Sequence, residues 1–257
     1  MKTVCYGAIK IKDDSSFSHN GIIKSIHMIQ QRKGKLIVIE GGDGSGKGTQ
    51  AALLRAYFEK NNVPYAYVDF PDYESVYGKI IAKFLRGEFG SLEEISPYFV
   101  GTLFGLDRSI QKKTIGEHLQ QGKIVLANRY TTSNMAHQGS KFVSSEDLST
   151  FISWLENFEY TVLGLPREDL VIFLSVPWQI AVKLTKAKES REYLQGESQD
   201  IQEKDEKHRR DTEKMYQYLA ANKSHWTTID CTKHGTILSK EEIHRALIAL
   251  LQEHGIL

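Results

Sequence analysis

The sequence predicts an α/β fold whose central sheet has five, mainly parallel, strands, and two observations carry this prediction. Five short apolar segments alternate with helix-like segments along the chain. Several of these segments are continuously apolar rather than alternating, which is typical of parallel strands covered by helices on both faces. A sheet between two helical layers is a three-layer fold.

The predicted strands are bounded by proline, glycine or polar residues, which interrupt regular structure. Pro64 precedes the second strand, and Pro71 and Pro177 follow the second and the fourth. The strands are expected at residues 36–39, 65–69, 124–127, 170–176 and 226–230.

Helices are expected between these strands at 49–60, at 76–85 and from 97 towards 110, and after the last strand at 240–252. Residues 76–85 carry apolar side chains at the spacing of one helical face. Ser96 followed by Pro97 is typical of an N-cap and a first helical position. We therefore expect one α/β domain over residues 35–257, preceded by a poorly ordered extension over residues 1–34.

Composition excludes several classes of protein. The 33 basic and 32 acidic residues give a formal net charge of +1, which argues against a protein that coats nucleic acid or a membrane. The two cysteines, Cys5 and Cys231, lie far apart and form no metal-ligand spacing, which favours a reducing compartment. No apolar run reaches the 18 residues of a membrane span. We expect a soluble, cytoplasmic protein.

Residues 183–214 form a charged block with nine basic and nine acidic residues. A balanced block of this kind is typical of a solvated helical face. Its alternative interpretation is a mobile lid that brings cations over phosphate groups.

A glycine-rich segment joins the first predicted strand to the first predicted helix. Gly41, four residues and then Gly46-Lys47 match the P-loop spacing, in which backbone N–H groups surround phosphate oxygens and the lysine adds a positive charge. The residues predicted to bind ATP are Gly41, Gly42, Gly44, Ser45, Gly46, Lys47, Gly48 and Thr49. Because Gly48 follows the lysine where a hydroxyl is usual, Thr49 is the predicted Mg²⁺-binding hydroxyl.

A P-loop alone leaves kinases, ATPases and GTPases open. A GTPase would need an Asn-Lys-x-Asp motif to recognise the base, and Asn222-Lys223 lacks the aspartate. This disfavours the GTPase class.

Five further segments, taken in order, carry a family resemblance. They are Gly42-Asp43; Phe70-Pro71; Leu103-Phe104 through Asp107-Arg108; Asn128-Arg129-Tyr130 with Ser133 and Ala136-His137-Gln138; and Gly164-Leu165-Pro166 with Asp169. From about residue 35 to the end, the chain resembles the thymidylate kinases, a family of nucleoside monophosphate kinases within the P-loop kinase fold.

This resemblance implies ATP-dependent phosphorylation of dTMP to dTDP, assisted by Mg²⁺, in a homodimer that binds neither nucleic acid nor membrane. It implies catalytic roles for Lys47, Arg129 and Arg191. The residues implied in acceptor binding are Asp43, Phe70, Phe104, Arg108, Arg129, Ser133, Gln138 and Tyr193. Asp43 would meet the 3′-hydroxyl, Phe104 the thymine ring, Arg129 the phosphate and Tyr193 the deoxyribose.

Each implied role has a structural alternative. Phe104 could be a core residue, Arg108 could pair with a carboxylate on its own helix, and Tyr193 could be an ordinary amphipathic tyrosine. Ser133 and Gln138 could be plain loop residues, and His137 is expected to be one.

The chain also departs from the family pattern at several positions. Asn128 stands where many members have aspartate, so it would reach Mg²⁺ through water without adding charge. Asp69 and Asp72 flank Phe70-Pro71, where arginine is common before the phenylalanine. Gly44 stands where some members have an arginine, so the charged block would supply that cation, with Lys186, Lys188 and Arg191 as candidates. These departures keep two alternatives open: a kinase for another pyrimidine monophosphate, and a nucleotide-binding protein with weak or lost catalysis.

Overall fold

The computed structural model describes residues 33–186, 192–196 and 199–257. Predictions for the extension 1–34 therefore fall almost wholly outside the described residues, as do those for Lys188 and Arg191. Within the described residues, the central sheet has five strands in the order β2-β3-β1-β4-β5, and all neighbouring strands are parallel. The strands are β1 (Lys35–Glu40), β2 (Tyr65–Asp69), β3 (Ile124–Asn128), β4 (Leu170–Ser175) and β5 (Trp226–Asp230). This confirms the predicted fold class.

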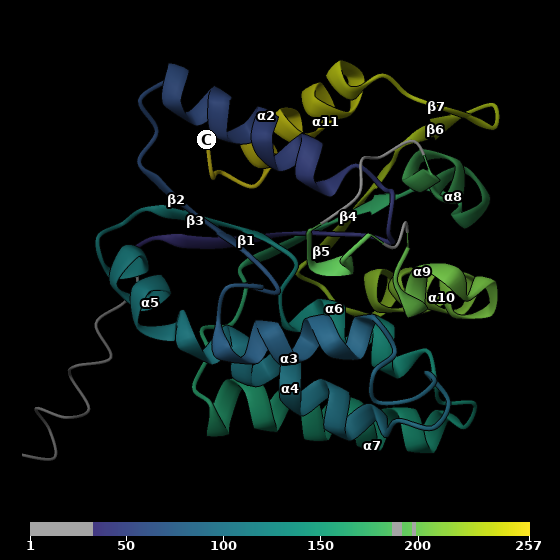
Figure 1. Cartoon of the computed structure of the whole chain (residues 1–257). Coiled ribbons are helices and arrows are strands. Elements are labelled where there is room, and N and C mark those ends of the chain that lie inside the picture. Colours follow the sequence, from purple (N-terminus) through teal and green to yellow (C-terminus); the bar gives the residue numbers. More distant parts are fainter. Residues whose placement is uncertain (1–32, 187–191, 197–198) are drawn as a thin grey trace, which may run out of the picture. The chain divides into compact units, whose positions relative to one another are not determined.

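Helices cover both faces of the sheet (Figure 1). One face packs against α2 (Lys47–Lys60), α8 (Trp178–Lys186) and α11 (Lys240–Glu253) through an apolar cluster that includes Ile37, Leu54 and Leu247. The opposite face packs against α5 (Lys112–Gln120), α6 (Thr131–Gly139), α7 (Ser145–Glu156) and α10 (Glu206–Asn222). A third apolar cluster joins α3 (Val76–Leu85) to α4 (Pro97–Ile110). Shorter elements are η1 (Asn157–Val162), η2 (Glu192–Leu194), α9 (Ile201–Lys204), β6 (Thr232–Lys233) and β7 (Thr236–Ile237).

Helix α6 is one of several helices that the sequence analysis did not predict. All of its residues are buried, although most of them are polar. Ser133, His137 and Gln138 lie on this helix, so their interpretation as loop residues is wrong.

The charged block 183–214 spans the end of α8, η2, α9 and the first half of α10. In α10, His208, Arg209 and Thr212 are buried. The C-terminal part of the block is thus a packed helix, and the opening and closing of a lid over residues 183–214 stays a prediction.

Among the helices of the described ranges, none is long and apolar enough to cross a membrane.

Candidate active site

The P-loop occupies the turn between β1 and α2, at the carboxyl end of the central strand. Gly46 adopts a left-handed conformation with φ 88°, and α2 begins at Lys47. The Lys47 Nζ donates to the carbonyl oxygens of Gly41 and Gly42, each at 2.8 Å. The loop therefore curls around its own lysine and directs it to the carboxyl edge of the sheet, where ligands bind in open α/β folds.

The backbone conformation and the packing at Gly44 explain why this P-loop has no arginine at that position. Its φ is +90°, and a Cβ atom built on it would lie 2.3 Å from the carbonyl oxygen of Ala181 on α8. Helix α8 thus packs directly on the loop. A side chain at Gly44 would require both a strained backbone and movement of α8.

The two P-loop hydroxyls differ in environment. Ser45 is 3% exposed, and its Oγ has no hydrogen-bond partner among the described residues. Thr49 is exposed on α2 and does not line the main cavity. Its role in Mg²⁺ binding stays a prediction.

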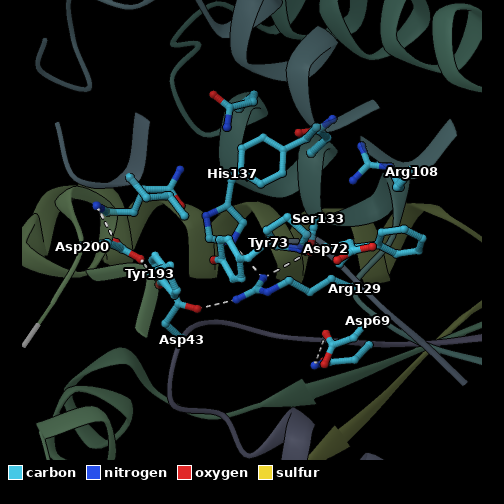
Figure 2. Close-up of a pocket in the computed structure, with 18 residues that line it drawn as sticks. Asp43, Asp69, Asp72, Tyr73, Arg108, Arg129, Ser133, His137, Tyr193 and Asp200 are labelled. Carbon is cyan, nitrogen blue, oxygen red and sulfur yellow. Dashed lines mark hydrogen bonds and ion pairs between the residues drawn. The ribbon is translucent and has the colours of Figure 1, made fainter. Parts of the chain in front are cut away.

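A cavity of about 370 Å³ opens beside the P-loop (Figure 2). All of the residues predicted to bind the acceptor line it: Asp43, Phe70, Phe104, Arg108, Arg129, Ser133, Gln138 and Tyr193. They come from segments spread over 151 positions, from 43 to 193. The structure thus brings the predicted acceptor residues together in one place, and their individual roles remain to be proposed.

Arg129 and Asp43 form an ion pair at the P-loop side of this cavity, from Nη2 to Oδ1 (Figure 2). Arg129 follows β3 with a φ of 65°, an uncommon conformation for a residue other than glycine. Burial disfavours the ionised forms of both Asp43 and Arg129. The positive charges of Arg129 and Lys47 nevertheless hold the pKa of Asp43 well below its ordinary value. Asp43 in turn raises the pKa of Arg129 above its ordinary value. Both groups are therefore ionised near neutral pH.

A buried carboxylate, Glu40, holds the polar residues behind Arg129 in place. It is 0% exposed and accepts hydrogen bonds from Thr132 Oγ1 (2.7 Å), Ser133 Oγ (2.7 Å) and Tyr216 OH (2.8 Å). The sequence analysis missed Glu40, because nothing in its position at the end of an apolar strand reveals bonds to residues some 90 and 176 positions away.

Arg108 is fixed by a second buried carboxylate, Glu159 of η1. Its Nε and Nη2 donate to the two Glu159 oxygens at 2.7 and 2.5 Å. Asn134 and Thr131 donate to the same carboxylate. The pairing with a carboxylate was foreseen, but the partner lies on η1 rather than on the helix of Arg108. Nη1 is the guanidinium nitrogen that Glu159 does not engage.

The aromatic wall of the cavity includes Phe104 and Tyr193. Phe104 is half-buried, lines the cavity and packs edge-on against Phe84, so it is partly a core residue. Tyr193 stacks on Tyr73 with ring centroids 4.1 Å apart, and its hydroxyl donates to Asp200 at 3.1 Å. Tyr73 was missed by the sequence analysis, although it lies two residues after the Phe70-Pro71 motif.

Asn128 and Asp69 lie side by side at the ends of β3 and β2, where they are register partners. The Asn128 Nδ2 donates to Asp69 Oδ1 at 2.9 Å. The Asn128 Oδ1 is buried and has no hydrogen-bond partner within the described ranges. Oxygen donors of this kind suit Mg²⁺ or its water ligands, so the pair fits the predicted metal position.

Arg209 of α10 is a cation that the sequence analysis did not single out. Its Nε donates to the Glu203 carbonyl at 2.6 Å, and its Nη1 lies 3.5 Å from the Asp43 carbonyl. The residue is 8% exposed, and its Nη2 has no partner among the residues that the structure describes. Arg209 therefore places a positive charge against the P-loop from the side of the charged block.

A parallel sheet, a P-loop at the end of its central strand and a cavity beside that loop that is lined by Arg108 and Arg129 define a P-loop kinase of the three-layer type. Comparison with known proteins identifies the family. The thymidylate kinase family model matches residues 39–244, and the chain belongs to this family.

Relatives from distant organisms agree with this assignment. The chain is 33% identical to a thymidylate kinase of Mycobacterium tuberculosis over 72% of this chain and 86% of that protein. It is 31% identical to a thymidylate kinase of Plasmodium falciparum over 85% and 90% of the two chains. The solved structure of thymidylate kinase from Candida albicans shares the fold with a TM-score of 0.66 at 21% identity, covering 87% of this chain and 93% of that chain.

Proposed function

We propose that this chain transfers the terminal phosphoryl group of ATP to dTMP, giving ADP and dTDP. The observation that carries the proposal is the Arg129–Asp43 pair, which stands where the P-loop meets the cavity. This position suits a group that holds the phosphate of an acceptor facing the end of a donor triphosphate.

The chemistry requires positioning and charge neutralisation rather than a general base, because the acceptor phosphate oxygen is already ionised. Lys47 would neutralise the donor phosphates, and Arg129 the acceptor phosphate. Mg²⁺, held by the Thr49 hydroxyl and, through water, by the Asn128 amide oxygen, would supply further positive charge on the donor phosphates. Held in line by these groups, the two phosphates would react with little further ordering.

For the acceptor, we propose that Phe104 stacks on the thymine ring and that Arg108 Nη1 and Gln138 bond its polar edge. Gln138 is 1% exposed, and its Oε1 has no hydrogen-bond partner in the described part of the chain, so it can accept from a ring N–H. Phe70, Ser133 and Tyr193 would form the wall around the sugar. Asp43 would accept from the 3′-hydroxyl.

For the donor side, we propose Arg209 as a cation in addition to Arg191. Arg191 is implied by family resemblance, whereas Arg209 is supported by its position on α10, where its Nη1 lies 3.5 Å from the P-loop carbonyl of Asp43. A homodimer is proposed from the family resemblance and from Phe99 and Ile110 of α4 and Val162 of η1, which are apolar and 52%, 49% and 66% exposed. A cytoplasmic location is proposed from the cysteine content alone.

The test is ADP release with ATP and each of dTMP, dUMP, dCMP, UMP, CMP and AMP. We expect the highest kcat/KM with dTMP. A single methyl group contributes only about 1–3 kcal/mol to discrimination, so dUMP should be a poor but measurable substrate. Preference for UMP or CMP would overturn the choice of dTMP. Tight ATP binding without turnover of any acceptor would favour a nucleotide-binding protein that has lost catalysis, the alternative that Asn128 keeps open.

A further inference from the structure

Two buried histidines stand behind Arg129, one on each of two helices. His137 lies on α6 and His208 on α10, and each is 8% exposed. The His137 Nδ1 lies 3.2 Å from the His208 Nε2. On its other side, the His137 Nε2 lies 3.2 Å from the Arg129 Nη1 (Figure 2). The three side chains therefore form a continuous line from the cavity to α10.

The guanidinium of Arg129 determines where the protons lie on both histidine rings. A guanidinium has only donors, so the His137 Nε2 must accept from Arg129 and carry no proton. The one proton of a neutral His137 is then on Nδ1 and is donated to His208 Nε2. His208 in turn must carry its proton on Nδ1. The contacts thus require neutral rings in one tautomer at both positions.

The surroundings keep both rings neutral. Burial and the positive charge of Arg129 hold the pKa of His137 well below its ordinary value. Burial and Lys141 lower the pKa of His208 to about 4. His137 therefore remains an acceptor for Arg129 near neutral pH.

His208 is itself tied to the first turn of α10. Its backbone N–H donates to Asp205 Oδ1, the N-cap of that helix, at 2.9 Å. Its Nε2 also lies 3.4 Å from the hydroxyl of Thr212, which is 2% exposed. A shift of the first turn of α10 would therefore move the acceptor that fixes His137.

We propose that His137 and His208 are positioning residues that orient the guanidinium of Arg129 and couple its orientation to the first turn of α10. Asp43 holds the Nη2 edge of that guanidinium, and His137, with Ser133, holds the Nη1 edge. The proposal rests on the proposed role of Arg129 as the ligand of the acceptor phosphate. It goes beyond that role by naming what sets the angle at which Arg129 meets the phosphate.

Three replacements of His137 test its contact with Arg129 and its contact with His208 one at a time. His137→Gln keeps an acceptor near the position of Nε2, His137→Asn keeps a donor near the position of Nδ1, and His137→Phe keeps neither. We expect the Phe and Asn variants to raise the KM for dTMP about tenfold, with the KM for ATP unchanged, because a small misorientation of a positioning group costs up to about a hundredfold. The Gln variant should stay within about threefold of the wild type.

Replacements of His208 test the second link. His208→Leu removes the acceptor for His137 and should raise the KM for dTMP in the same direction, whereas His208→Gln should largely restore it. His254→Phe, at an exposed histidine near the C-terminus, is the matched control for replacing a histidine. Thermal unfolding of each variant reports whether the fold is retained, and the His208 pair carries the test if His137→Phe does not fold.

Arg129→Lys distinguishes failure of this inference from failure of the proposed function. If Arg129→Lys leaves the KM for dTMP unchanged, the role of Arg129 is wrong. If Arg129→Lys raises it while His137→Asn and His208→Leu do not, the positioning role is wrong. If Arg129 binds the acceptor phosphate and His137 positions it, the effects of His137→Asn and Arg129→Lys on the KM for dTMP should be less than additive. Both changes act on the Arg129–His137 contact. A ¹⁵N NMR spectrum showing His137 protonated on Nε2 at pH 7 would also overturn the inference.

Discussion

At the scale of single residues, the site depends on buried carboxylates whose only visible task is to hold another side chain. Glu159 is the clearest case, because it holds Arg108 with two hydrogen bonds and is 0% exposed. Removing one partner of such a pair leaves an uncompensated charge in the interior, which costs more than the pair itself contributes.

We therefore expect Glu159→Gln to lower the free energy of unfolding by about 3–5 kcal/mol, the range for breaking a buried ion pair. Urea denaturation measures this change. Glu117→Gln is the matched control, since Glu117 pairs with Lys113 at 3.8 Å on the exposed face of α5 and its side chain is 54% exposed. The control should change stability by less than about 1 kcal/mol. Equal effects of the two substitutions would show that the Arg108–Glu159 pair does not stabilise the fold.

Asn128 gives a second prediction at this scale. Asn128→Asp would place a carboxylate beside Asp69, and two neighbouring carboxylates attract a divalent cation. We expect the Mg²⁺ concentration for half-maximal activity to fall, and Mn²⁺, followed by electron paramagnetic resonance, to bind more tightly in the presence of ATP. Asn222→Asp, at an exposed position of α10, controls for the added charge. Unchanged dependence on both ions would contradict a metal-side position for Asn128.

At the scale of elements, the sequence predicted the five strands and the helices α2, α3, α4 and α11 because their signals are local. The strands at 65–69 and 226–230 and the helix at 76–85 have the predicted bounds. Helix α6 could not be predicted in this way, because its polar residues are buried by bonds to Glu40, Glu159 and the cavity rather than by an apolar stripe. The P-loop and Arg129 were foreseen because their motifs are contiguous. Glu40, Tyr73 and Arg209 were not, because their contacts join distant parts of the chain.

At this scale, we predict different effects on catalysis for two neighbouring arginines of α10. Arg209 and Arg210 are neighbours, but Arg209 is buried against the P-loop whereas the side chain of Arg210 is 51% exposed. We expect Arg209→Met to lower kcat about a hundredfold with ATP, the order of effect of a cation that stabilises charge in phosphoryl transfer. Arg210→Met should keep nearly full activity. Steady-state kinetics of the two variants measure this difference in kcat. A fully active Arg209→Met variant would contradict a donor-side role for Arg209.

At the scale of the whole molecule, buried ionisable groups make stability depend on pH in two opposing ways. Burial holds the folded-state pKa of His137 well below 6.5 and lowers that of His208 to about 4, so the contribution of both residues to stability is present above pH 6.5 and is lost as the pH falls below it. Burial of Glu168 acts oppositely, because it raises the pKa of that carboxyl from 4.5 to about 7. The contribution of Glu168 is therefore fully present below pH 4.5 and is lost as the pH rises towards 7.

This opposition gives the last prediction, made with Glu168→Gln. Glu168 is 8% exposed and accepts from the Tyr160 hydroxyl at 2.8 Å with both oxygens, so a neutral amide can occupy the same place and keep an acceptor. The amide does not ionise, so the variant should gain stability over the wild type as the pH rises from 5 to 7, by up to about 1.4 kcal/mol for each unit by which the pKa is raised. Urea denaturation of both proteins at pH 5, 6 and 7 measures the difference. Glu253→Gln, at the exposed end of α11, is the control for replacing a glutamate by an amide. A Glu168→Gln difference that stays constant from pH 5 to pH 7 would show that Glu168 ionises as readily in the folded chain as in the unfolded one.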